Sequence, residues 1–358
     1  MSVKKEKKSG NSNDNSMESL QQKNISLKDV AAYLKLSPTT VSIVLNNSPL
    51  ADSIPQETKD RIFEAARNLN YRPNYIARSL RNQRTHTIGV LIPEMSDGYS
   101  AAVLSGVEER LLQEGYFYFV ASHHHHTDLI EKNTQFLVGR CVEGILAIDT
   151  PTNQQSLVPI VSISGHNRVK GITNIVLNHE KAAQLAIEHL HDLGHRKIAV
   201  IKGQEFSSDT EVRLSTILAT AQKFDIFIAD NLITQLIGDD PSPETGYRAT
   251  KELLSRGVKF TAILAFNDIS AIGAIRAFRE NGLDVPKDIS IIGFDDITAA
   301  EFHYPALTTI RQPLKQMGNL GAEHLLQNIQ KNSAEIPSLE ITVEPDLIIR
   351  QSTADASK

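Results

Sequence analysis

Four consecutive histidines, His123 to His126, are the first residues of this sequence that invite a chemical interpretation. Imidazole nitrogens bind zinc, usually in tetrahedral sites that Cys, Asp or Glu side chains help to complete. Adjacent loop residues cannot easily converge on one ion, and no such partner pattern accompanies these histidines. We therefore expect a loop without a metal, in which His123 lies nearest to the preceding strand and could contact a ligand.

Residues arranged for catalysis are no easier to find. Asp295 and Asp296 could pass for a carboxylate pair, but neighbouring residues at a strand end point in opposite directions. The sequence contains no GxSxG, P-loop or HExxH motif. We therefore expect that the protein is not an enzyme and needs no cofactor.

Polar residues instead gather at the ends of apolar segments. Continuous apolar runs such as 85–94 alternate with amphipathic stretches such as 99–114, which is typical of βαβ units and a parallel sheet covered on both faces. The pattern restarts after residue 160, which predicts an α/β core of two successive doubly wound halves facing one cleft. Ligands bind such sheets beyond the carboxyl ends of the strands, where this sequence has Glu94, His123, Asp149, Ser164, Asn267, Asp268, Asp295 and Asp296.

The stretch before this core has a helical pattern. Ser26, followed by Asp29, is typical of a helix N-terminus, and an apolar stripe follows at Leu27, Val30, Ala31 and Leu34. Ser37 and Pro38 begin a second short helix, which is expected to bury Val41, Val44 and Leu45. Two short helices joined by a tight turn predict a helix-turn-helix, whose second helix can lie in the DNA major groove. A packed αα-hairpin that does not bind DNA is the alternative.

The charge distribution favours DNA. A third helix is expected from about Pro55 to Leu69, with an inner face formed by Ile62, Phe63, Ala66 and Leu69, and residues 71–84 then contain four arginines and no acid. Residues 1–84 hold 14 Lys and Arg against 8 Asp and Glu, whereas the remainder holds 23 against 34. The overall net charge of −5 therefore hides a basic head on an acidic body.

Composition also bears on the cellular compartment. The single cysteine, Cys141, excludes an intrachain disulfide and fits a reducing cytoplasm. No apolar run approaches the length needed to span a membrane. Residues 1–24 begin with lysines, but no apolar segment follows them. They predict a disordered polar extension and not a secretory signal.

Several segments together resemble the LacI/GalR (lactose-repressor/galactose-repressor) family of bacterial transcription regulators. They are LKDVA at 27–31, SPTTVS and VLN within 37–46, IPQET at 54–58, and YRPN and ARSLR within 71–81. In the core they are HLHDLGHRKIAVIKG, AFNDISAIGAIRAFRENG, DISIIGFDD and LTTIRQP. The resemblance covers about residues 25–352, and it implies a core with the fold of periplasmic sugar-binding proteins.

The resemblance implies a domain order. It begins with an extension (1–24), a helix-turn-helix domain (25–73) and a hinge (74–84) that becomes helical on the operator. A two-lobed effector-binding and dimerisation core (85–352) and a tail (353–358) follow. A homodimer would bind a near-palindromic operator, and a small molecule, expected to be a sugar or a sugar derivative, would control it from the cleft. The short tail contains no heptad repeat, which favours a dimer over a tetramer.

The expected DNA contacts come partly from side-chain chemistry and partly from the resemblance. In the family, arginine is usual where this chain has Ile43, and isoleucine can offer a base only apolar contact. We therefore expect an unusual half-site, although Ile43 could instead pack beneath its helix. The residue matching Leu80 wedges into the central minor groove in the family. The full set is Leu27, Ser37, Pro38, Thr39, Thr40, Ser42, Ile43, Asn46, Ala77, Leu80 and Arg81.

The expected effector contacts have groups that can bond a polyhydroxy ligand. They are Tyr99, Ser100, His123, Arg213, Asn267, Asp268, Asp295 and Gln312. Two departures from the family leave the ligand open, because Asp97-Gly98-Tyr99-Ser100 replaces the frequent Asn-Pro-Phe-Phe and Asn178 replaces a frequent Asp. The core alone would also fit a solute receptor for transport, but residues 25–84 and the missing signal peptide disfavour that alternative.

Overall fold

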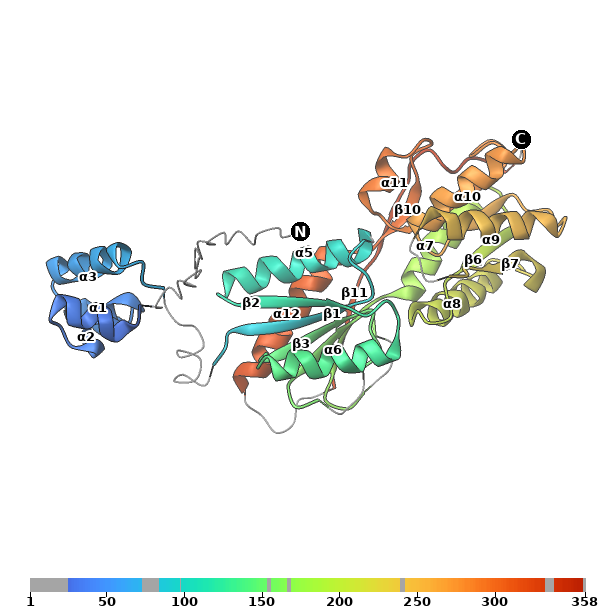
Figure 1. Ribbon diagram of the computed structural model, residues 1–358. Coiled ribbons are helices and arrows are strands. Elements are labelled where there is room, and N and C mark those ends of the chain that lie inside the picture. Colours follow the sequence, from blue (N-terminus) through green and yellow to red (C-terminus); the bar gives the residue numbers. More distant parts are fainter. Residues whose placement is uncertain are drawn as a thin grey trace, which may run out of the picture. The chain divides into compact units, whose positions relative to one another are not determined.

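The computed structural model describes residues 25–72, 84–96, 98–152, 156–165, 169–238, 242–331 and 338–356. The chain divides into two compact units, Met1–Gln83 and Arg84–Lys358 (Figure 1). We call the described part of the first the head unit and the second the core unit. The expected extension 1–24 and the expected hinge contacts Ala77, Leu80 and Arg81 lie outside the described residues.

The head unit is a small helical domain. Its elements are α1 (Leu27–Leu34), α2 (Pro38–Leu45), the 3₁₀ turn η1 (Pro49–Ser53) and α3 (Gln56–Asn68). The first helix begins where the sequence predicts. The Ser26 hydroxyl accepts a hydrogen bond from the Asp29 backbone N–H at 3.3 Å, and the Asp29 carboxylate accepts one from the Ser26 N–H at 2.8 Å. This reciprocal capping box satisfies two backbone donors that the helix itself cannot pair.

One apolar cluster holds the three head helices together. It consists of Val30, Ala31, Val41, Val44, Ile62 and Ala65, with Leu27, Leu34, Leu45 and Leu69 packed against it. The expected inner face of α3 was wrong at one residue. Phe63 remains 37% exposed, whereas Ala65 is 3% exposed and takes the inward position. The helix turns by about 100° per residue, so Ala65 lies about 60° from Ile62 around the helix axis, whereas Phe63 lies about 100° from it.

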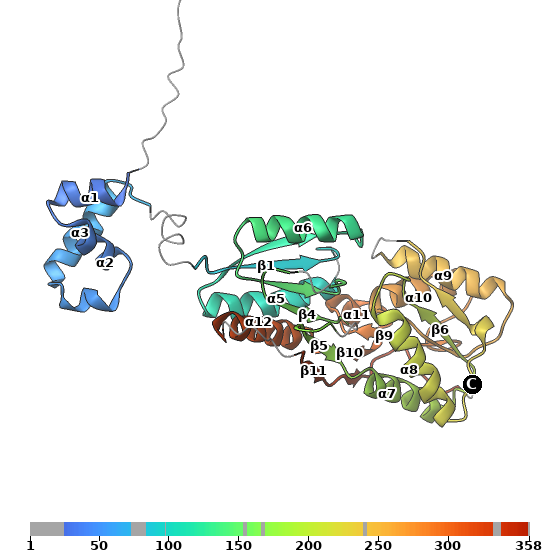
Figure 2. The ribbon, with the colours of Figure 1, turned by 90° about the horizontal axis from the view of Figure 1, so that it is seen from below.

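The first lobe of the core unit is a wholly parallel six-stranded sheet in the order β11-β5-β4-β3-β1-β2. Helices α5 and α12 cover one face and α6 covers the other, as Figures 1 and 2 show. The strands are β1 (Thr87–Ile92), β2 (Phe117–Ser122), β3 (Gly144–Ile148), β4 (Ile160–Ile163), β5 (Thr173–Leu177) and β11 (Glu340–Val343). The helices are α5 (Gly98–Gln113), α6 (Thr127–Gly139) and α12 (Leu314–Lys331).

The second lobe has the sheet order β12-β10-β9-β8-β6-β7, in which only β12 runs antiparallel to its neighbour. Helices α7 and α8 lie on one face and α9 and α10 on the other (Figure 2). The strands are β6 (Ile198–Lys202), β7 (Ile233–Gln235), β8 (Ala262–Leu264), β9 (Ser290–Asp295), β10 (Thr308–Arg311) and β12 (Asp346–Ile348). The helical elements are α7 (His179–Asp192), α8 (Asp209–Lys223), η2 (Asp230–Leu232), α9 (Pro243–Ser255), α10 (Asp268–Glu280) and α11 (Thr298–Phe302).

The two lobes are interleaved along the chain, and the expected division after residue 160 was wrong. Strands β4 and β5 join the first sheet, and the late strand β11 pairs with β5 in the same sheet. The chain passes between the lobes around 177–179, 311–314 and 343–346. Apolar periodicity identifies each strand but not its sheet, because sheet membership depends on pairing between distant segments.

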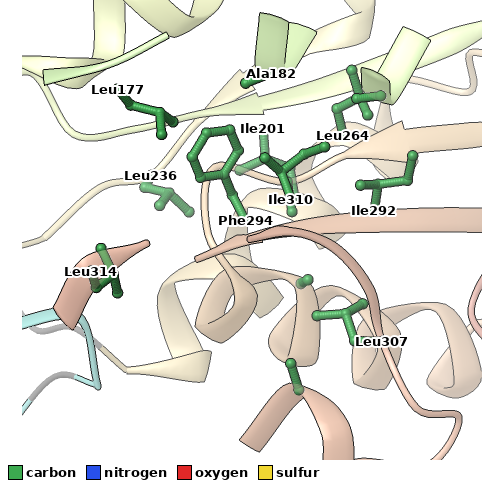
Figure 3. Packing of buried hydrophobic residues seen from close by; sticks show 14 of the residues in the cluster. Leu177, Ala182, Ile201, Leu236, Leu264, Ile292, Phe294, Leu307, Ile310 and Leu314 are labelled. Carbon is green, nitrogen blue, oxygen red and sulfur yellow. The ribbon is translucent and has the colours of Figure 1, made fainter. Parts of the chain in front are cut away.

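Buried strand residues connect the second lobe's core with its polar site. Figure 3 shows Ile201, Leu264, Ile310 and Phe294, which come from β6, β8, β10 and β9 and are all nearly inaccessible to solvent. Phe294 extends from this cluster to the strand end, where polar residues begin. Within the described ranges, no helix has both the length and the apolar character needed to cross a lipid bilayer.

Candidate effector site and nucleic-acid interface

The strand ends of the two lobes meet through direct contacts. The Ser208 hydroxyl, which precedes α8, donates to the Ser164 carbonyl beyond β4 at 2.7 Å. The rings of His125 and Phe206 stack across the same junction, with centroids 3.7 Å apart and an angle of 25° between planes. We call the polar residues at this junction the interlobe site: Tyr99, Asp149, Ser164, Ser208, Asp209, Arg213, Asp295 and Gln312.

Arg213 is the centre of the second lobe's contribution. Only 6% of it is exposed, its Nη1 donates to the Phe266 carbonyl at 2.7 Å, and its Nη2 forms a short ion pair with Asp209 one helical turn earlier. The guanidinium lies between the rings of Phe266 and Phe294, 4.6 and 3.9 Å from their centroids. Burial alone would lower the pKa of Arg213, but the negative charges of Asp209 and Asp295 outweigh burial and raise it.

Asp209 also pairs with a residue from α7. Its Oδ1 lies 3.6 Å from His179 Nε2, and the His179 ring stacks on Phe294. His179 and Arg213 line a cavity of about 20 Å³ between α7, α8 and the second sheet, which is room for about one water molecule. This cavity is far too small to hold a sugar.

Asp295 occupies the end of β9 with an unusual backbone, at a φ of +107°. Its Oδ1 accepts a hydrogen bond from Gln312 Nε2 at 2.7 Å, and both side chains are buried. Burial raises the pKa of Asp295 well above its usual value, while Arg213 opposes that rise. The neighbouring Asp296 bonds Arg311 and Arg350 instead, so the two carboxylates do not form a pair.

Asp268 is enclosed at the start of α10. Its oxygens accept from the Thr309 hydroxyl at 2.6 Å and the Ile297 backbone N–H at 2.9 Å. Burial raises its pKa to about 7. A Cβ on Gly293 would lie 2.2 Å from the Asp268 carboxylate, so the absence of a side chain at Gly293 leaves room for this carboxylate. With no exposed surface, Asp268 is placed to hold the loop that follows Asp295.

Tyr99 and Ser100 come from the first turn of α5. The Tyr99 hydroxyl bonds the Ser164 hydroxyl at 2.5 Å. Burial raises the pKa of Tyr99 well above its usual value, and the negative charges of Asp209, Asp149 and Asp295 add to the rise. Ser100 is fully buried. Tyr99 therefore belongs to the first lobe but shares an electrostatic environment with carboxylates of both lobes.

His123 is held as a neutral ring. Its Nδ1 accepts from the His125 backbone N–H at 3.1 Å, so Nε2 carries the proton and donates to the Thr150 hydroxyl at 2.8 Å. Burial lowers the pKa of His123 to about 4, which agrees with a neutral ring. Within the described segments, no group of three or more His, Cys, Asp and Glu residues is placed to hold a metal ion.

Of the eight expected effector residues, the structure brings Tyr99, Arg213, Asp295 and Gln312 into the interlobe site. Asn267 lies at its edge as the N-cap of α10, where its Oδ1 accepts from the Ser270 N–H at 2.9 Å. Asp268, Ser100 and His123 lie beneath the surface of the site.

The sequence interpretation missed Asp209, His179, Phe266 and Phe294. A local sequence signal was available for Asp209 alone, because it is a carboxylate four residues before Arg213 on an expected helix.

The head unit presents its polar groups differently, around the N-terminus of α2. Ser37, Pro38 and Thr39 are exposed. The Ser37 hydroxyl caps α2 by accepting from the Thr40 N–H at 3.0 Å, and Asn46 Nδ2 donates to the Ser42 carbonyl at 2.7 Å. Backbone N–H groups and hydroxyls at such a helix end suit phosphate oxygens and base edges.

Ile43 and Leu27 differ in their packing. Ile43 is half-exposed and is absent from the apolar cluster of the head unit, which contains its neighbours Val41 and Val44. Its side chain is therefore available on the surface of α2. Leu27 is half-buried and packs against that cluster, so it contributes to the fold of the head.

Known proteins resemble both units. Residues 26–74 match the family described as bacterial regulatory proteins, lacI family, and residues 187–353 match the periplasmic binding protein-like domain. The HTH-type transcriptional repressor PurR of Glaesserella parasuis serovar 5 (strain SH0165) is 31% identical over 346 residues, which cover 93% of this chain and 99% of that protein.

Solved structures agree with this result. The lac repressor dimer bound to operator and the anti-inducer ONPF has 27% sequence identity and a TM-score of 0.80, covering 93% of this chain and 100% of that chain. The transcriptional regulator CelR in complex with cellobiose has 25% identity and a TM-score of 0.68, covering 92% and 99%.

Proposed function

Since this chain belongs to the lacI family of bacterial regulatory proteins, we propose that it is a DNA-binding transcriptional repressor controlled by a small-molecule effector. The observation that carries the proposal is one continuous relationship. A repressor matches 93% of the chain at 31% identity, across both the helix-turn-helix head and the two-lobed core. The head would bind DNA and the core would bind the effector. A transcription regulator therefore accounts for both units without a catalytic step.

We propose that the head reads DNA with the exposed N-terminal end of α2. The hydroxyls of Ser37, Thr39 and Thr40 would bond phosphates or base edges, and Ile43 would offer an apolar surface to a base, such as a thymine methyl. The hinge contacts Ala77, Leu80 and Arg81 remain predictions from the sequence. One head covers one half-site, so we propose a homodimer on a near-palindromic operator in the bacterial cytoplasm.

The DNA proposal is tested by selecting operators from a random DNA pool with the full chain and with Ile43→Arg. Arginine can donate two hydrogen bonds to guanine, so the variant should enrich guanine at one symmetric pair of positions, a preference worth about 1–3 kcal/mol. Glu64→Gln, on the exposed face of α3, is the matched control and should select the unchanged sequence. Identical selected sites for wild type and Ile43→Arg would remove Ile43 from the interface.

We propose that the effector binds the interlobe site and changes how the lobes are held, and so the affinity for the operator. Ser208 and His125 already bridge the lobes, and a ligand inserted among these contacts would exchange them for its own. A coupling of about 1–3 kcal/mol between effector and operator is ordinary, and it acts equally in both directions. Free sugars, their derivatives and nucleosides are the proposed classes of effector.

Thermal unfolding of the protein against a panel of these compounds tests the second half of the proposal. A ligand at about 100 times its dissociation constant stabilises the native state by about 2.7 kcal/mol. Operator binding repeated with each compound that stabilises the protein then separates an inducer from a corepressor. A stabilising compound that leaves operator affinity unchanged would contradict control through the interlobe site.

A further inference from the structure

One largely buried carboxylate, that of Glu143, holds the first residues of the core unit. Its Oε1 accepts hydrogen bonds from the backbone N–H groups of Thr85 and His86, at 2.6 and 2.8 Å. Its Oε2 accepts a hydrogen bond from Arg84 Nε at 2.9 Å and lies 2.9 Å from Arg84 Nη2 as well. The Glu143 side chain is only 10% exposed. Three consecutive residues are therefore bonded to one side chain that is distant from them in the sequence.

A tyrosine completes this arrangement. The Tyr116 hydroxyl accepts a hydrogen bond from Arg84 Nη2 at 2.5 Å, and the Tyr116 ring packs against the His86 ring with centroids 5.1 Å apart. Burial alone would raise the pKa of Glu143, but the hydrogen bonds from Arg84 and from the backbone outweigh burial and lower it. The bonds between Glu143 and Arg84 are therefore assisted by charge. We call these five residues the entry clamp: Arg84, Thr85, His86, Tyr116 and Glu143.

The entry clamp lies at the edge of the first sheet where its strands begin. Glu143 immediately precedes β3, and residues 84–86 immediately precede β1. Because β1 and β3 are adjacent and parallel, their starts lie at the same edge of the sheet. The strand ends that contribute to the interlobe site lie at the opposite edge. The entry clamp is therefore separate from the site proposed for the effector.

The entry clamp also marks where the chain leaves the core unit. Residues 73–83 connect the described part of the head to Arg84, and they lie outside the described residues. We call them the tether. The paired residues of β1 begin at Thr87, so Arg84 and Thr85 precede the sheet. If the bonds to Glu143 were lost, these two residues could join the tether and lengthen it by up to about 7 Å.

We propose that Glu143 is a positioning residue for operator binding, because it fixes the point at which the tether leaves the core unit and so limits how far apart the two half-sites of an operator can lie. This inference rests on the proposed function, since it assumes a homodimer on a near-palindromic operator. It goes further by giving one carboxylate of the core unit a role in DNA recognition.

The physical basis is the reach of the tether. Once one head of a dimer is bound, the second head meets its half-site at an effective concentration that depends on tether length. Binding of both heads together is lost when the tether cannot span the distance between the half-sites. A clamp that withholds two residues from each tether therefore narrows the range of half-site spacings that the dimer accepts.

The experiment measures the affinity of the full chain for a series of operators. The palindrome selected from the random DNA pool is lengthened at its centre by one base pair at a time. The proteins compared are wild type, Glu143→Ala, and a variant with two glycines inserted between Gln83 and Arg84, which lengthens the tether and leaves the clamp intact. Glu252→Ala is the matched control, because this carboxylate also pairs with an arginine, Arg256, but does so on α9 of the second lobe.

We expect Glu143→Ala and the glycine variant to accept longer operators than wild type. Two residues add up to about 7 Å per chain, and one base pair adds about 3.4 Å between half-sites. The insertion that lowers affinity by about tenfold should therefore be longer by at least about two base pairs. Affinity for the original palindrome should fall by no more than about threefold, because effective concentration falls only slowly with tether length. Glu252→Ala should keep the wild-type profile.

Each insertion also rotates one half-site about the DNA axis by about 35°. Every variant is compared with wild type on the same DNA, so this rotation affects all the proteins alike. A loss of stability in the core unit would lower affinity equally on every operator, whereas a longer tether changes the dependence on spacing. The shape of the profile therefore separates the proposed role of Glu143 from a contribution to folding alone.

A Glu143→Ala protein with the wild-type dependence on spacing would overturn the inference, and so would a wild type that binds every operator of the series equally well. If calorimetry shows that Glu143→Ala does not fold, Arg84→Ala takes its place, since it removes the ion pair from the more exposed side. This variant should shift the profile in the same direction, and an unshifted profile would again overturn the inference. If the random pool yields no palindrome for wild type, the proposed function fails and the inference with it. A palindrome with unshifted profiles removes the inference alone.

Discussion

In the head unit, the polar side chains proposed to contact DNA lie exposed around the start of α2, and the apolar cluster that stabilises the unit is formed by other residues. In the interlobe site, Arg213, Asp209 and Asp295 are nearly enclosed. Arg213 and Asp209 are bonded to each other, and Asp295 accepts a hydrogen bond from the Gln312 side chain. An exposed group can change its partner at little cost, whereas a buried charge depends on the one that it has.

The two regions therefore differ in whether the same residues determine both stability and function. In the head, a residue proposed to contact DNA, such as Thr39, should be exchangeable while the fold remains, because the fold depends on the cluster around Ile62. In the interlobe site, the side chains proposed to hold the effector are also those that pair buried charges, so the removal of one charge should affect folding and ligand response together. The predictions that follow test this contrast, beginning with the largest effect.

Arg213→Ala should be the most damaging single change in the core unit. It leaves the Asp209 carboxylate buried without its strongest partner, and breaking a buried pair in this way destabilises proteins by about 3–5 kcal/mol. Denaturant unfolding measures the loss, and the response to effectors should disappear with it. Arg248→Ala, which removes an exposed partner of Glu244 on α9, is the control and should leave unfolding unchanged. A small loss for Arg213→Ala would show that water replaces the guanidinium and that solvent reaches the site.

Asp268 predicts a pH dependence of the core unit. Its pKa in the folded protein is raised from 3.8 to about 7, so the native state binds this proton more tightly than the unfolded chain. The resulting stabilisation is complete below about pH 4 and is lost as the pH rises to 7. The loss amounts to roughly 4 kcal/mol of unfolding free energy. Asp268→Asn should remove this part of the slope when unfolding free energies are measured from pH 4 to 7.

The control for that profile is Asp128→Asn, whose carboxylate is exposed on α6 and whose pH profile should follow wild type. Asp295 has a raised pKa of the same sign, so some slope should remain in the Asp268 variant. Parallel profiles for wild type and Asp268→Asn would mean that the carboxylate is ionised in the native state near pH 5, and that solvent reaches it.

Ile62→Ala tests the other side of the contrast. Ile62 has no exposed surface in a cluster of six buried residues, and such truncations cost about 2–5 kcal/mol. A unit of this size has little stability to spare, so calorimetry should show the head unfolded and operator binding lost, while the transition of the core unit is unchanged. Phe63→Ala, one residue along and 37% exposed, should retain DNA binding. A shifted core transition would show that the two units are coupled in stability.

The same contrast explains what the sequence could predict. The structure of the head could be predicted because its sequence signals are local. The Ser26–Asp29 cap, the Ser37-Pro38 restart and the apolar stripes each lie within a few residues, and the helices appear where those signals place them. The one error concerned the edge of the inner face of α3, where Ala65 and not Phe63 packs against the cluster.

The interlobe site could be predicted from the sequence only in part. Strand ends and the family resemblance pointed to Tyr99, Arg213, Asp295 and Gln312, but the assignment of strands to sheets was wrong after residue 160. Whether a polar residue at a strand end is open or buried depends on what segments distant in the sequence place over it. His123 and Asp268 illustrate this, because Thr150 in one case and Thr309 in the other enclose them through long-range contacts.

The smallest effect compares one motif that occurs in both regions. Ser26 caps α1 in the head and Asn267 caps α10 in the core, each in a reciprocal capping box. Replacement of either by alanine removes one cap, so Ser26→Ala and Asn267→Ala should each cost about 1 kcal/mol in their own unit. Calorimetry of the two transitions measures both costs.

The consequences for function should then differ, because Ser26 would act only through the stability of the head, whereas Asn267 lies beside the interlobe site. Conditions in which the head remains folded should therefore restore full operator binding to Ser26→Ala, but no such conditions should restore the effector response of Asn267→Ala. An Asn267→Ala protein with an intact effector response would reduce this residue to a helix cap, and would confine the effector to the residues around Arg213 and Asp295.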